Sequence, residues 1–266
     1  MDDVALVRAD NPSPLTLTGT NTWLVGRDPC WVVDPGPADL PAHVEAVLAA
    51  ARERGGVGGV VLTHGHGDHA GAARAVADGG GSGGVPILAA AWEGATERIG
   101  EGDAAGPWLQ AIAVPGHATD HLCFALDGGA VCLTGDAVLG AGSVFIAPDP
   151  GALRGYLDGL ERLRARGFAR LLPGHGPIVE DADAKLGEYL AHRLDRERRL
   201  VEALDAGARS IDALLDAAWS DAPAALRLPA TVTLFAHLDK LAEEGRLPDG
   251  VEERPEWFEQ LGRHAH

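Results

Sequence analysis

Two patterns that decide the fold meet in the stretch Val60-Val61-Leu62-Thr63-His64-Gly65-His66-Gly67-Asp68-His69-Ala70-Gly71. Its first three residues are aliphatic and predict the end of a buried β-strand. The polar residues that follow predict a loop, and from Ala70 onward the spacing of alanine and valine becomes helical. The histidines therefore lie where a strand passes through a turn into a helix, the edge at which α/β folds tend to place their chemistry.

The same stretch supplies a dense set of side chains that can bind metal, namely His64, His66, Asp68 and His69. Imidazole nitrogen and carboxylate oxygen together suit zinc, iron or a similar first-row ion. The spacing of two residues lets His64 and His66 point the same way, whereas the adjacent Asp68 and His69 could serve a second ion. Gly65 and Gly67 are expected to permit a tight backbone. A solvated histidine-rich loop is the other interpretation, but a tag of that kind would lie at a terminus.

Further strand-like runs end in turns that carry a histidine or an aspartate. His117 follows the run at 112–114 and is a candidate for the third imidazole on the first ion. Asp136 follows a predicted hairpin at 122–133, and a carboxylate at this point can bridge two cations. His175 follows the run at 169–172. His121 is expected to hold its loop by hydrogen bonding.

Three other residues are predicted to support the site without binding metal: Asp34, Thr63 and His121. Asp34 follows the strand-like run 31–33, and two interpretations remain open. It could cap a turn, or it could accept a hydrogen bond that orients a metal-bound imidazole. Upstream, residues 16–20 and 21–25 are expected to form a hairpin around Gly19.

Composition narrows the class of protein. At 266 residues the chain can bury a large core and could hold one large and one small domain. Its net charge of −17 argues against broad non-specific binding to nucleic acid. Cys30, Cys123 and Cys132 lie in apolar runs without a CxxC motif, which indicates buried free thiols in a reducing compartment. With neither a signal peptide nor an apolar run of about twenty residues, we expect a cytoplasmic protein with no membrane partner.

The character of the chain changes at residue 181. A long charged helix is predicted over 182–206 and carries Arg193, Arg196, Arg198 and Arg199. Two shorter helical segments and a turn at 243–247 follow, which suggests a winged-helix-like appendage. We therefore predict a catalytic domain over 1–180 and a helical module over 181–266. The segment 228–240 is mostly apolar, so DNA binding is not expected. The module should instead pack or support a possible homodimer.

The chain resembles the metallo-β-lactamase superfamily in four motifs that occur in order: Thr63-His64-Gly65-His66-Gly67-Asp68-His69, Pro115-Gly116-His117, Thr134-Gly135-Asp136 and Pro173-Gly174-His175. Within that superfamily it is similar to the β-lactamase-like protein 2 branch. The closer similarity rests on the amino-terminal segments 11–14, 19–26 and 33–37 together with the carboxyl-terminal module. The resemblance covers nearly the whole chain.

This resemblance implies an α/β fold, a four-layer αβ/βα sandwich with a dinuclear site between its sheets. It implies that the first ion is held by His64, His66 and His117, the second by Asp68, His69 and His175, and that Asp136 bridges them. Zinc is the expected metal, although related enzymes use iron or manganese. The sequence departs from the pattern where Gly65 and Gly67 replace larger residues and where Trp23 replaces the common tyrosine. These departures affect the expected substrate.

The expected function is that of a metal-dependent hydrolase. Two cations can lower the pKa of water to near 7, and the resulting hydroxide would attack a carbonyl or phosphoryl centre. Asp68 is the residue expected to orient that water or carry its proton. The branch resemblance implies cleavage of single-stranded RNA, with the arginines at 193–199 contacting the backbone, but the acidic net charge disagrees. A glyoxalase II-like hydrolase of a small thioester or lactone is the alternative, and an iron-dependent redox enzyme is a third possibility.

Overall fold

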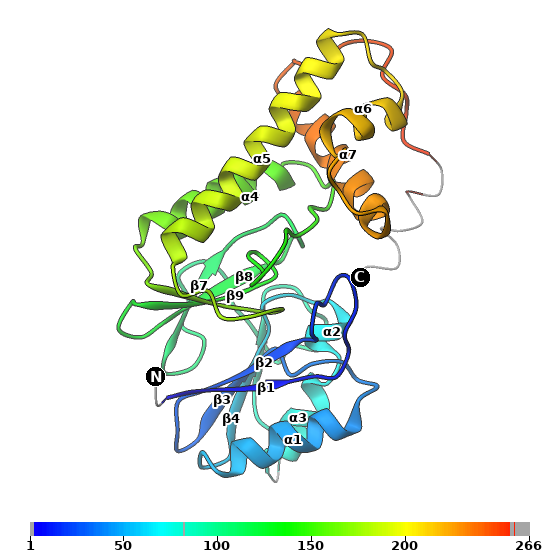
Figure 1. The fold of residues 1–266 in the computed structure, drawn as a ribbon. Coiled ribbons are helices and arrows are strands. Elements are labelled where there is room, and N and C mark those ends of the chain that lie inside the picture. The colour runs from blue at the N-terminus through cyan, green and yellow to red at the C-terminus, as the bar shows by residue number, and fades with distance from the viewer. Residues whose placement is uncertain (1–2, 82, 256–257, 259–266) are drawn as a thin grey trace.

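Two β-sheets packed face to face, with helices on both outer faces, form the body of the protein (Figure 1). The computed structural model describes residues 3–81, 83–255 and 258. The six strands of the first sheet are hydrogen-bonded in sequence order: β1 (Val4–Arg8), β2 (Asn21–Val25), β3 (Cys30–Val33), β4 (Val57–Val61), β5 (Ile87–Ala89) and β6 (Glu97–Arg98). The four strands of the second sheet have the order β10 (Arg170–Pro173), β9 (Val131–Gly135), β8 (Leu122–Leu126) and β7 (Leu109–Ala113).

Both sheets mix strand directions. In the first sheet the β1–β2 and β2–β3 pairs are antiparallel, and the pairs from β3 to β6 are parallel. In the second sheet β7, β8 and β9 form an antiparallel meander, and β10 joins it parallel to β9. Parallel pairs need a crossover connection. Helices provide it between β3 and β4, between β4 and β5, and between β9 and β10, whereas a loop joins β5 to β6. As a result, the carboxyl ends of β4, β9 and β10 can deliver their loops to one edge.

Alternating side chains bury both faces of each sheet. In β2, Trp23 and Val25 pack between the two sheets, whereas Leu24 packs toward α1 (Pro41–Arg52) and α3 (Ala73–Gly79). In β8, Phe124 faces the first sheet, whereas Cys123 faces α4 (Ala152–Ala165). This period of two is the natural side-chain repeat of a strand. The layers therefore run helix, sheet, sheet, helix, which confirms the predicted αβ/βα arrangement.

The predicted hairpin around Gly19 is wrong. β2 pairs instead with β1, from Val4 opposite Val25 to Arg8 opposite Asn21. The intervening segment is a loop held by side chains, because Asn11 Oδ1 accepts from the Thr20 amide at 2.8 Å and Asn11 Nδ2 donates to Thr20 Oγ1. Gly19 has a φ of +116°, which an extended strand residue would not adopt.

The cysteines have the state predicted from the sequence. Cys30, Cys123 and Cys132 are buried and free. Each lies on a strand inside an apolar cluster, where a thiol packs as a small hydrophobic side chain. Within the described part of the chain, no helix is both long enough and apolar enough to cross a membrane.

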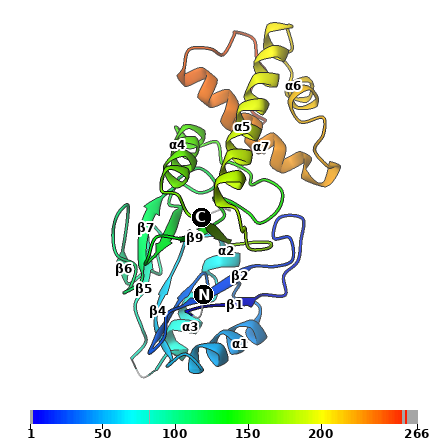
Figure 2. The ribbon, with the colours of Figure 1, turned by 60° about the vertical axis from the view of Figure 1, so that its left-hand side comes forward.

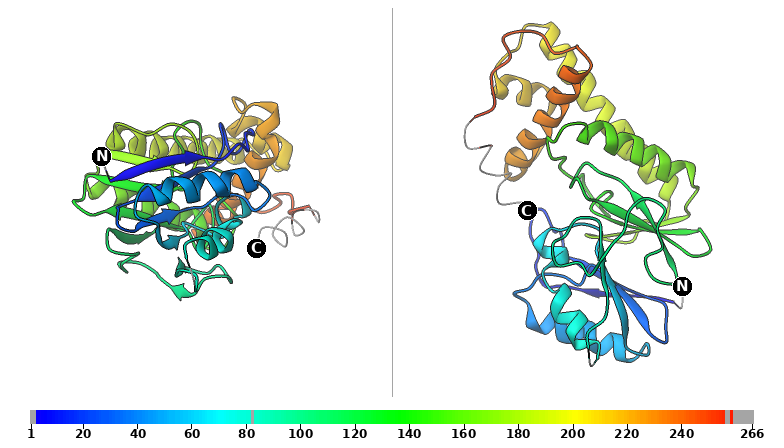
Figure 3. Two further views of the ribbon diagram at one scale, coloured as in Figure 1. Left: turned by 90° about the horizontal axis from the view of Figure 1, so that it is seen from below. Right: turned by 180° about the vertical axis from the view of Figure 1, so that it is seen from behind.

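The carboxyl-terminal part is helical. It comprises α5 (Ala182–Asp205), α6 (Ile211–Ala218), the 3-10 turn η1 (Ala224–Leu226) and α7 (Arg227–Glu243). Figures 2 and 3 show α6 and α7 gathered at the far end of α5, away from α1 and α3. Leu200 and Leu204 of α5 pack there with Leu214 of α6 and Leu234 of α7, in a hydrophobic cluster of their own.

The predicted winged-helix form of this module is not confirmed. Among the described residues no strand follows β10, so the turn after α7 leads into a segment without a wing. Individual hydrogen bonds hold that segment to the rest of the module. In one of them the Glu252 amide donates to the Arg209 carbonyl at 2.8 Å. The predicted boundary at residue 180 stays a prediction. Helix α5 contributes Leu186 and Tyr189 to the core beneath α4, and its second half to the module.

Truncating the buried face of α5 should destabilise the protein, whereas truncating its exposed face should not. Leu200 is fully buried in the module cluster, and Leu194 is 57 % exposed on the same helix. We expect Leu200→Ala to lower the free energy of unfolding by about 2–5 kcal/mol, and Leu194→Ala to change it by less than about 0.5 kcal/mol. Urea unfolding followed by circular dichroism measures both. A loss for Leu200→Ala as small as the one expected for Leu194→Ala would contradict a stabilising role for the cluster.

Candidate metal centre

Loops from both sheets bring seven histidine and aspartate side chains together at one edge. His64 and His66 follow β4, and Asp68 and His69 lie in the short helix α2 (Gly67–Ala70). The second sheet supplies His117 after β7, Asp136 after β9 and His175 after β10. They form overlapping groups whose ligand atoms lie within 4.8 Å of one another: His64, His66 and His117; His64, His69 and Asp136; and Asp68, His69 and His175.

Hydrogen bonds between the two sheets hold these loops in place. The Leu122 amide donates to the Thr63 carbonyl at 2.7 Å, which ties the start of β8 to the end of β4. The Asn21 side chain donates to the Pro173 carbonyl at 3.0 Å and to the Gly176 carbonyl at 2.9 Å. The loop that carries His175 is therefore fixed to β2 of the opposite sheet.

Glycine is required at the second sheet's loops and not at the histidine motif. A Cβ on Gly174 would lie 2.6 Å from Asp136 Oδ1 and 2.7 Å from His69 Cε1, so any larger residue would enter the centre. Gly65 and Gly67 do not have positive φ angles, and no atom lies within 3.4 Å of a Cβ built on either. The expectation that these two glycines permit a tight turn is therefore wrong. The absence of a side chain at these two positions leaves open space beside the histidine motif.

The first group of imidazoles has its nitrogen atoms turned toward one another. His66 Nδ1 lies 2.9 Å from His64 Nε2 and 3.0 Å from His117 Nε2. The outer nitrogens of two rings have acceptors, because His64 Nδ1 lies 3.0 Å from Thr63 Oγ1 and His117 Nδ1 lies 3.2 Å from the Phe145 carbonyl. Each of these rings thus keeps its proton on Nδ1 and presents the lone pair of Nε2 to the group.

These inward lone pairs fit a cation. A single proton on His66 Nδ1 can form a full hydrogen bond to only one of the two nitrogens that face it. Hydrogen bonding within the group therefore leaves at least one nitrogen lone pair without a donor. Three imidazole nitrogens around a tetrahedral zinc ion stand about 3.3 Å apart, given Zn–N bonds of about 2.0–2.1 Å. The observed separations of 2.9 and 3.0 Å are close to that spacing.

The second group contains the carboxylate of Asp68. His175 Nε2 lies 3.2 Å from His69 Nε2 and 3.2 Å from Asp68 Oδ2. Asp136 lies between the groups, since its Oδ2 is 3.4 Å from His175 Nε2 and 3.6 Å from His117 Nε2. Its Oδ1 is buried without a hydrogen-bond partner among the described residues. A buried carboxylate oxygen without a donor is costly, and a cation would satisfy it.

Asp34 orients rings in both groups. Its Oδ1 accepts from the Thr63 amide at 2.8 Å, and its Oδ2 accepts from Thr63 Oγ1 at 2.7 Å and from His69 Nδ1 at 2.9 Å. Because the Thr63 hydroxyl donates to Asp34, it can only accept from His64 Nδ1. Of the two interpretations left open by the sequence, the structure places Asp34 where it orients an imidazole.

His121 lies beside the two groups, but its Nε2 faces the backbone amide of Asp136 and not the other imidazoles. Its Nε2 accepts a hydrogen bond from the Asp136 amide at 3.0 Å, so this nitrogen does not face the other rings. Its ring lies 5.0 Å from that of His64. Trp23, the other departure noted in the sequence, is buried between the sheets and donates to the Pro173 carbonyl at 3.1 Å. It therefore supports the His175 loop and does not contact the cavity.

Burial and neighbouring charges set the protonation of these groups. Burial lowers the pKa of His117 to about 4 and lowers that of His64 well below its usual value, so both rings are neutral near pH 7. Burial acts to raise the pKa of Asp68, but His69 and His175 outweigh it and bring the value to about 2. The same two histidines lower the pKa of Asp136 despite its burial. Burial acts to lower the pKa of His69 and of His175, but the carboxylates, Asp136 first, outweigh it; they raise the pKa of His69 well above its usual value and that of His175 to about 9. A cation that binds there would displace these protons, because neutral imidazoles and ionised carboxylates are the forms that bind metal.

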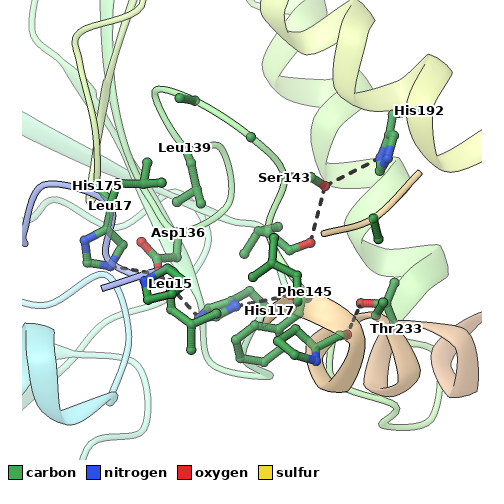
Figure 4. Close-up of a pocket in the computed structure, with 18 of the residues that line it drawn as sticks. Leu15, Leu17, His117, Asp136, Leu139, Ser143, Phe145, His175, His192 and Thr233 are labelled. Atoms are coloured by element: carbon green, nitrogen blue, oxygen red, sulfur yellow. Dashed lines mark hydrogen bonds and ion pairs between the residues drawn. The ribbon is translucent and has the colours of Figure 1, made fainter. Parts of the chain in front are cut away.

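Five of the seven residues line one end of a cavity of about 700 Å³: His66, Asp68, His117, Asp136 and His175. Figure 4 shows Asp136, His117 and His175 on one side, with Leu15, Leu17 and Leu139 beside them. The remaining walls come from residues 141–145, from α5 and from 219–233. Sequence reasoning missed these walls, because nothing in the apolar residues of the 13–17 loop or of α7 distinguishes a cavity wall from an ordinary core.

Comparison with known families and proteins agrees with this geometry. The sequence model of the Metallo-beta-lactamase superfamily matches residues 15–85 and 80–175. The Beta-lactamase-like protein 2 homolog of Caenorhabditis elegans is 31 % identical over 278 residues, covering 98 % of this chain and 90 % of that protein. The Lactamase-like protein nscB of Trichophyton equinum is 33 % identical over 76 % of this chain, which spans 61 % of that protein's length.

Solved structures share the fold. A beta-lactamase domain protein from Burkholderia ambifaria aligns with a TM-score of 0.80 at 22 % identity, over 94 % of this chain and 90 % of its own. A metallo-beta-lactamase family protein from Thermus thermophilus aligns with a TM-score of 0.74 at 23 % identity, over 92 % and 95 % of the two chains. The protein TTHA1623, solved in a di-iron-bound form, has a TM-score of 0.54 at 26 % identity, over 71 % and 97 %.

Removing the charge of Asp34 should weaken metal binding without removing a ligand. We expect Asp34→Asn to lower the affinity for Zn²⁺ about 10–100-fold, because the amide cannot accept from Thr63 and His69 as the carboxylate does. The exposed Asp39→Asn is the matched control and should bind as the wild type does. Competition with a chromophoric chelator on metal-stripped protein measures the affinities. Unchanged binding by Asp34→Asn would show that the ring orientations do not depend on this carboxylate.

Proposed function

The chain belongs to the metallo-beta-lactamase superfamily, and we propose that it is a dinuclear zinc hydrolase of a small ester, thioester or lactone. The observation that carries the proposal is the convergence of seven side chains that could bind metal, five of which line one end of a mostly apolar cavity. Hydrolase chemistry is general in the family, whereas the metal and the substrate class are our inference.

The proposed ligands divide as the two groups do. One ion would be held by His64, His66 and His117. The other ion would be held by Asp68, His69 and His175, and Asp136 would contact both ions. Metal ions bound there supply an acidified water and an electrophile for the substrate carbonyl. Three imidazoles are a donor set typical of catalytic zinc, although nitrogen and oxygen donors also suit iron, as in the di-iron-bound TTHA1623.

Asp68 is the proposed catalytic residue of the chain itself. Its side chain is 30 % exposed and lines the cavity, whereas that of Asp136 is 9 % exposed. With a pKa of about 2, Asp68 is ionised near neutral pH, so its carboxylate can accept a hydrogen bond from the attacking water and orient it. We propose this orienting role in addition to metal binding.

The cavity supports a compact substrate. Its volume of about 700 Å³ falls in the range of small-molecule sites. Its walls include the apolar side chains of Leu15, Leu139, Val144, Phe145 and Trp219. Such walls favour an acyl or aromatic group over a polyanionic strand, because burying apolar surface is the main driving force for binding there.

The arginines of α5 do not form a row that could follow an RNA backbone. Arg193 is buried, and Arg196 is paired with Asp221 Oδ2 at 2.9 Å. Arg198 and Arg199 both pair with Asp195 across one turn of the helix. Guanidinium groups already matched by carboxylates offer little net charge to phosphates. We therefore rank cleavage of single-stranded RNA below hydrolysis of a small acyl substrate.

Removing one ligand should separate metal binding from folding. We expect about two zinc ions per wild-type chain, and loss of at least one ion from His66→Ala. Hydrolysis should fall at least about 100-fold, while the circular dichroism spectrum stays unchanged. Elemental analysis after aerobic purification gives the metal content. Stoichiometric iron without zinc would favour the redox alternative, and full turnover by a verified metal-free variant would contradict the mechanism.

A substrate panel tests the acyl class against RNA. We expect the zinc-loaded protein to hydrolyse at least one small thioester, ester or lactone, with rates that change less than about twofold between 50 and 200 mM salt. A single-stranded RNA oligomer of mixed sequence should remain intact under the same conditions. Asp68→Asn serves as the inactive control in both assays. RNA cleavage that weakens steeply with salt and disappears in the control would replace the acyl proposal.

A further inference from the structure

A buried arginine lines the cavity on the side away from the candidate metal centre. Arg193 of α5 is 2 % exposed and contributes to the cavity wall together with His192 and Ser143. Figure 4 shows His192 and Ser143 across the cavity from His175 and Asp136. The cavity therefore connects the two metal-binding groups at one end with a guanidinium at the other.

The hydrogen-bonding capacity of Arg193 is only partly used. Its Nη2 donates to Ser143 Oγ at 3.0 Å and to the Val144 carbonyl, and its guanidinium lies 5.6 Å from the ring centre of Tyr156. Its Nε is buried without a hydrogen-bond partner among the described residues. The guanidinium also interacts with the hydroxyl of Tyr156, a neutral group whose pKa burial raises and the guanidinium acts to lower. No carboxylate of the described residues lies within 4.0 Å of the guanidinium. A buried charge without a counter-charge is strongly destabilising.

The other charged groups on this side of the cavity are already compensated. Arg196 forms a two-point pair with Asp221, and Glu188 accepts from Lys185 at 3.0 Å. His192 adds no charge near neutral pH, because burial and the adjacent arginines lower its pKa to about 4. Arg193 is therefore the cation of this wall that lacks an anionic partner among the described residues.

We propose that Arg193 binds a carboxylate carried by the substrate at the end remote from the bond that is cleaved. This rests on the proposed function and adds a substrate class to it, namely esters, thioesters or lactones with an anionic tail. A monoanionic carboxylate matches the single free guanidinium, whereas a phosphate dianion would leave net charge in an apolar cavity. The planar guanidinium suits a carboxylate in geometry as well as in charge.

A purely structural role does not account for the whole side chain. The bonds from Nη2 to Ser143 and Val144 hold the 139–146 loop against α5. They leave Nε without a partner and the positive charge without a carboxylate among the described residues, and a neutral donor could hold the same carbonyl without burying a charge. A structural role also predicts no preference among ligands, so ligand preference separates the two roles.

Binding of two matched non-hydrolysable probes tests the proposal. We expect 4-phenylbutyrate to bind the zinc-loaded protein at least tenfold more tightly than 4-phenylbutyramide, as measured by calorimetry. Arg193→Met should bind the two equally, and Arg199→Met, on the same helix and paired with Asp195, should keep the preference. Equal affinities in the wild type would overturn the proposal. So would a preference that persists in Arg193→Met, because the carboxylate would then be binding the metals.

The design separates this proposal from the proposed function. Neither probe is hydrolysed, so a carboxylate preference without turnover of any ester, thioester or lactone would contradict the hydrolase proposal alone. With turnover, glutaryl and glutaramyl thioesters form the matched pair, and Arg193→Met should remove the difference in KM between them. If Arg193→Met fails to fold, Arg193→Lys takes its place. A reduced carboxylate preference in Arg193→Lys would support the proposal, because lysine keeps the charge but not the planar guanidinium, and an undiminished preference would overturn it.

Discussion

The carboxylate of Asp34 is the interaction on which the organisation of the centre depends. It is almost fully buried and accepts three hydrogen bonds, from the amide and the hydroxyl of Thr63 and from His69 Nδ1. A buried charge is tolerated when donors surround it in this way. The same bonds decide which nitrogen of His64 and of His69 faces the centre, so one acidic group orients a ring in each of the two metal-binding groups.

The position of the centre follows from how two sheets are joined. Its residues extend from His64 to His175 along the chain, and they come together because loops from both sheets end at one edge. Bonds from Asn21 to the β10 loop and from Leu122 to Thr63 prevent the loops from separating. Rigid sheets thus keep the lone pairs of the imidazoles close to each other, an arrangement that a flexible loop would relax.

The helical module completes the cavity. Residues of α5, of the 219–226 segment and of α7 form the walls that the sheets do not provide. These walls are mostly apolar. The arginines on α5 either pair with carboxylates, as Arg196 and Arg199 do, or are buried, as Arg193 is. The chain is strongly acidic overall, yet its cavity contains an arginine without a carboxylate partner among the described residues. We therefore propose that substrate selection depends on the interior of the cavity more than on the surface charge of the protein.

The sequence by itself determined the four-layer class and the seven side chains that meet at the centre. The side chains follow from local patterns, since strand periodicity marks buried faces and a histidine or aspartate after each strand marks its carboxyl end. The four-layer class follows from the resemblance of the motifs to a known superfamily. Only the tertiary structure decided that β1 pairs with β2, that no wing follows α7 among the described residues, and that Arg193 is buried beside the cavity. The reason is physical. A local pattern reports which face of an element is buried, but the partner that covers this face is chosen by contacts between segments far apart in the chain.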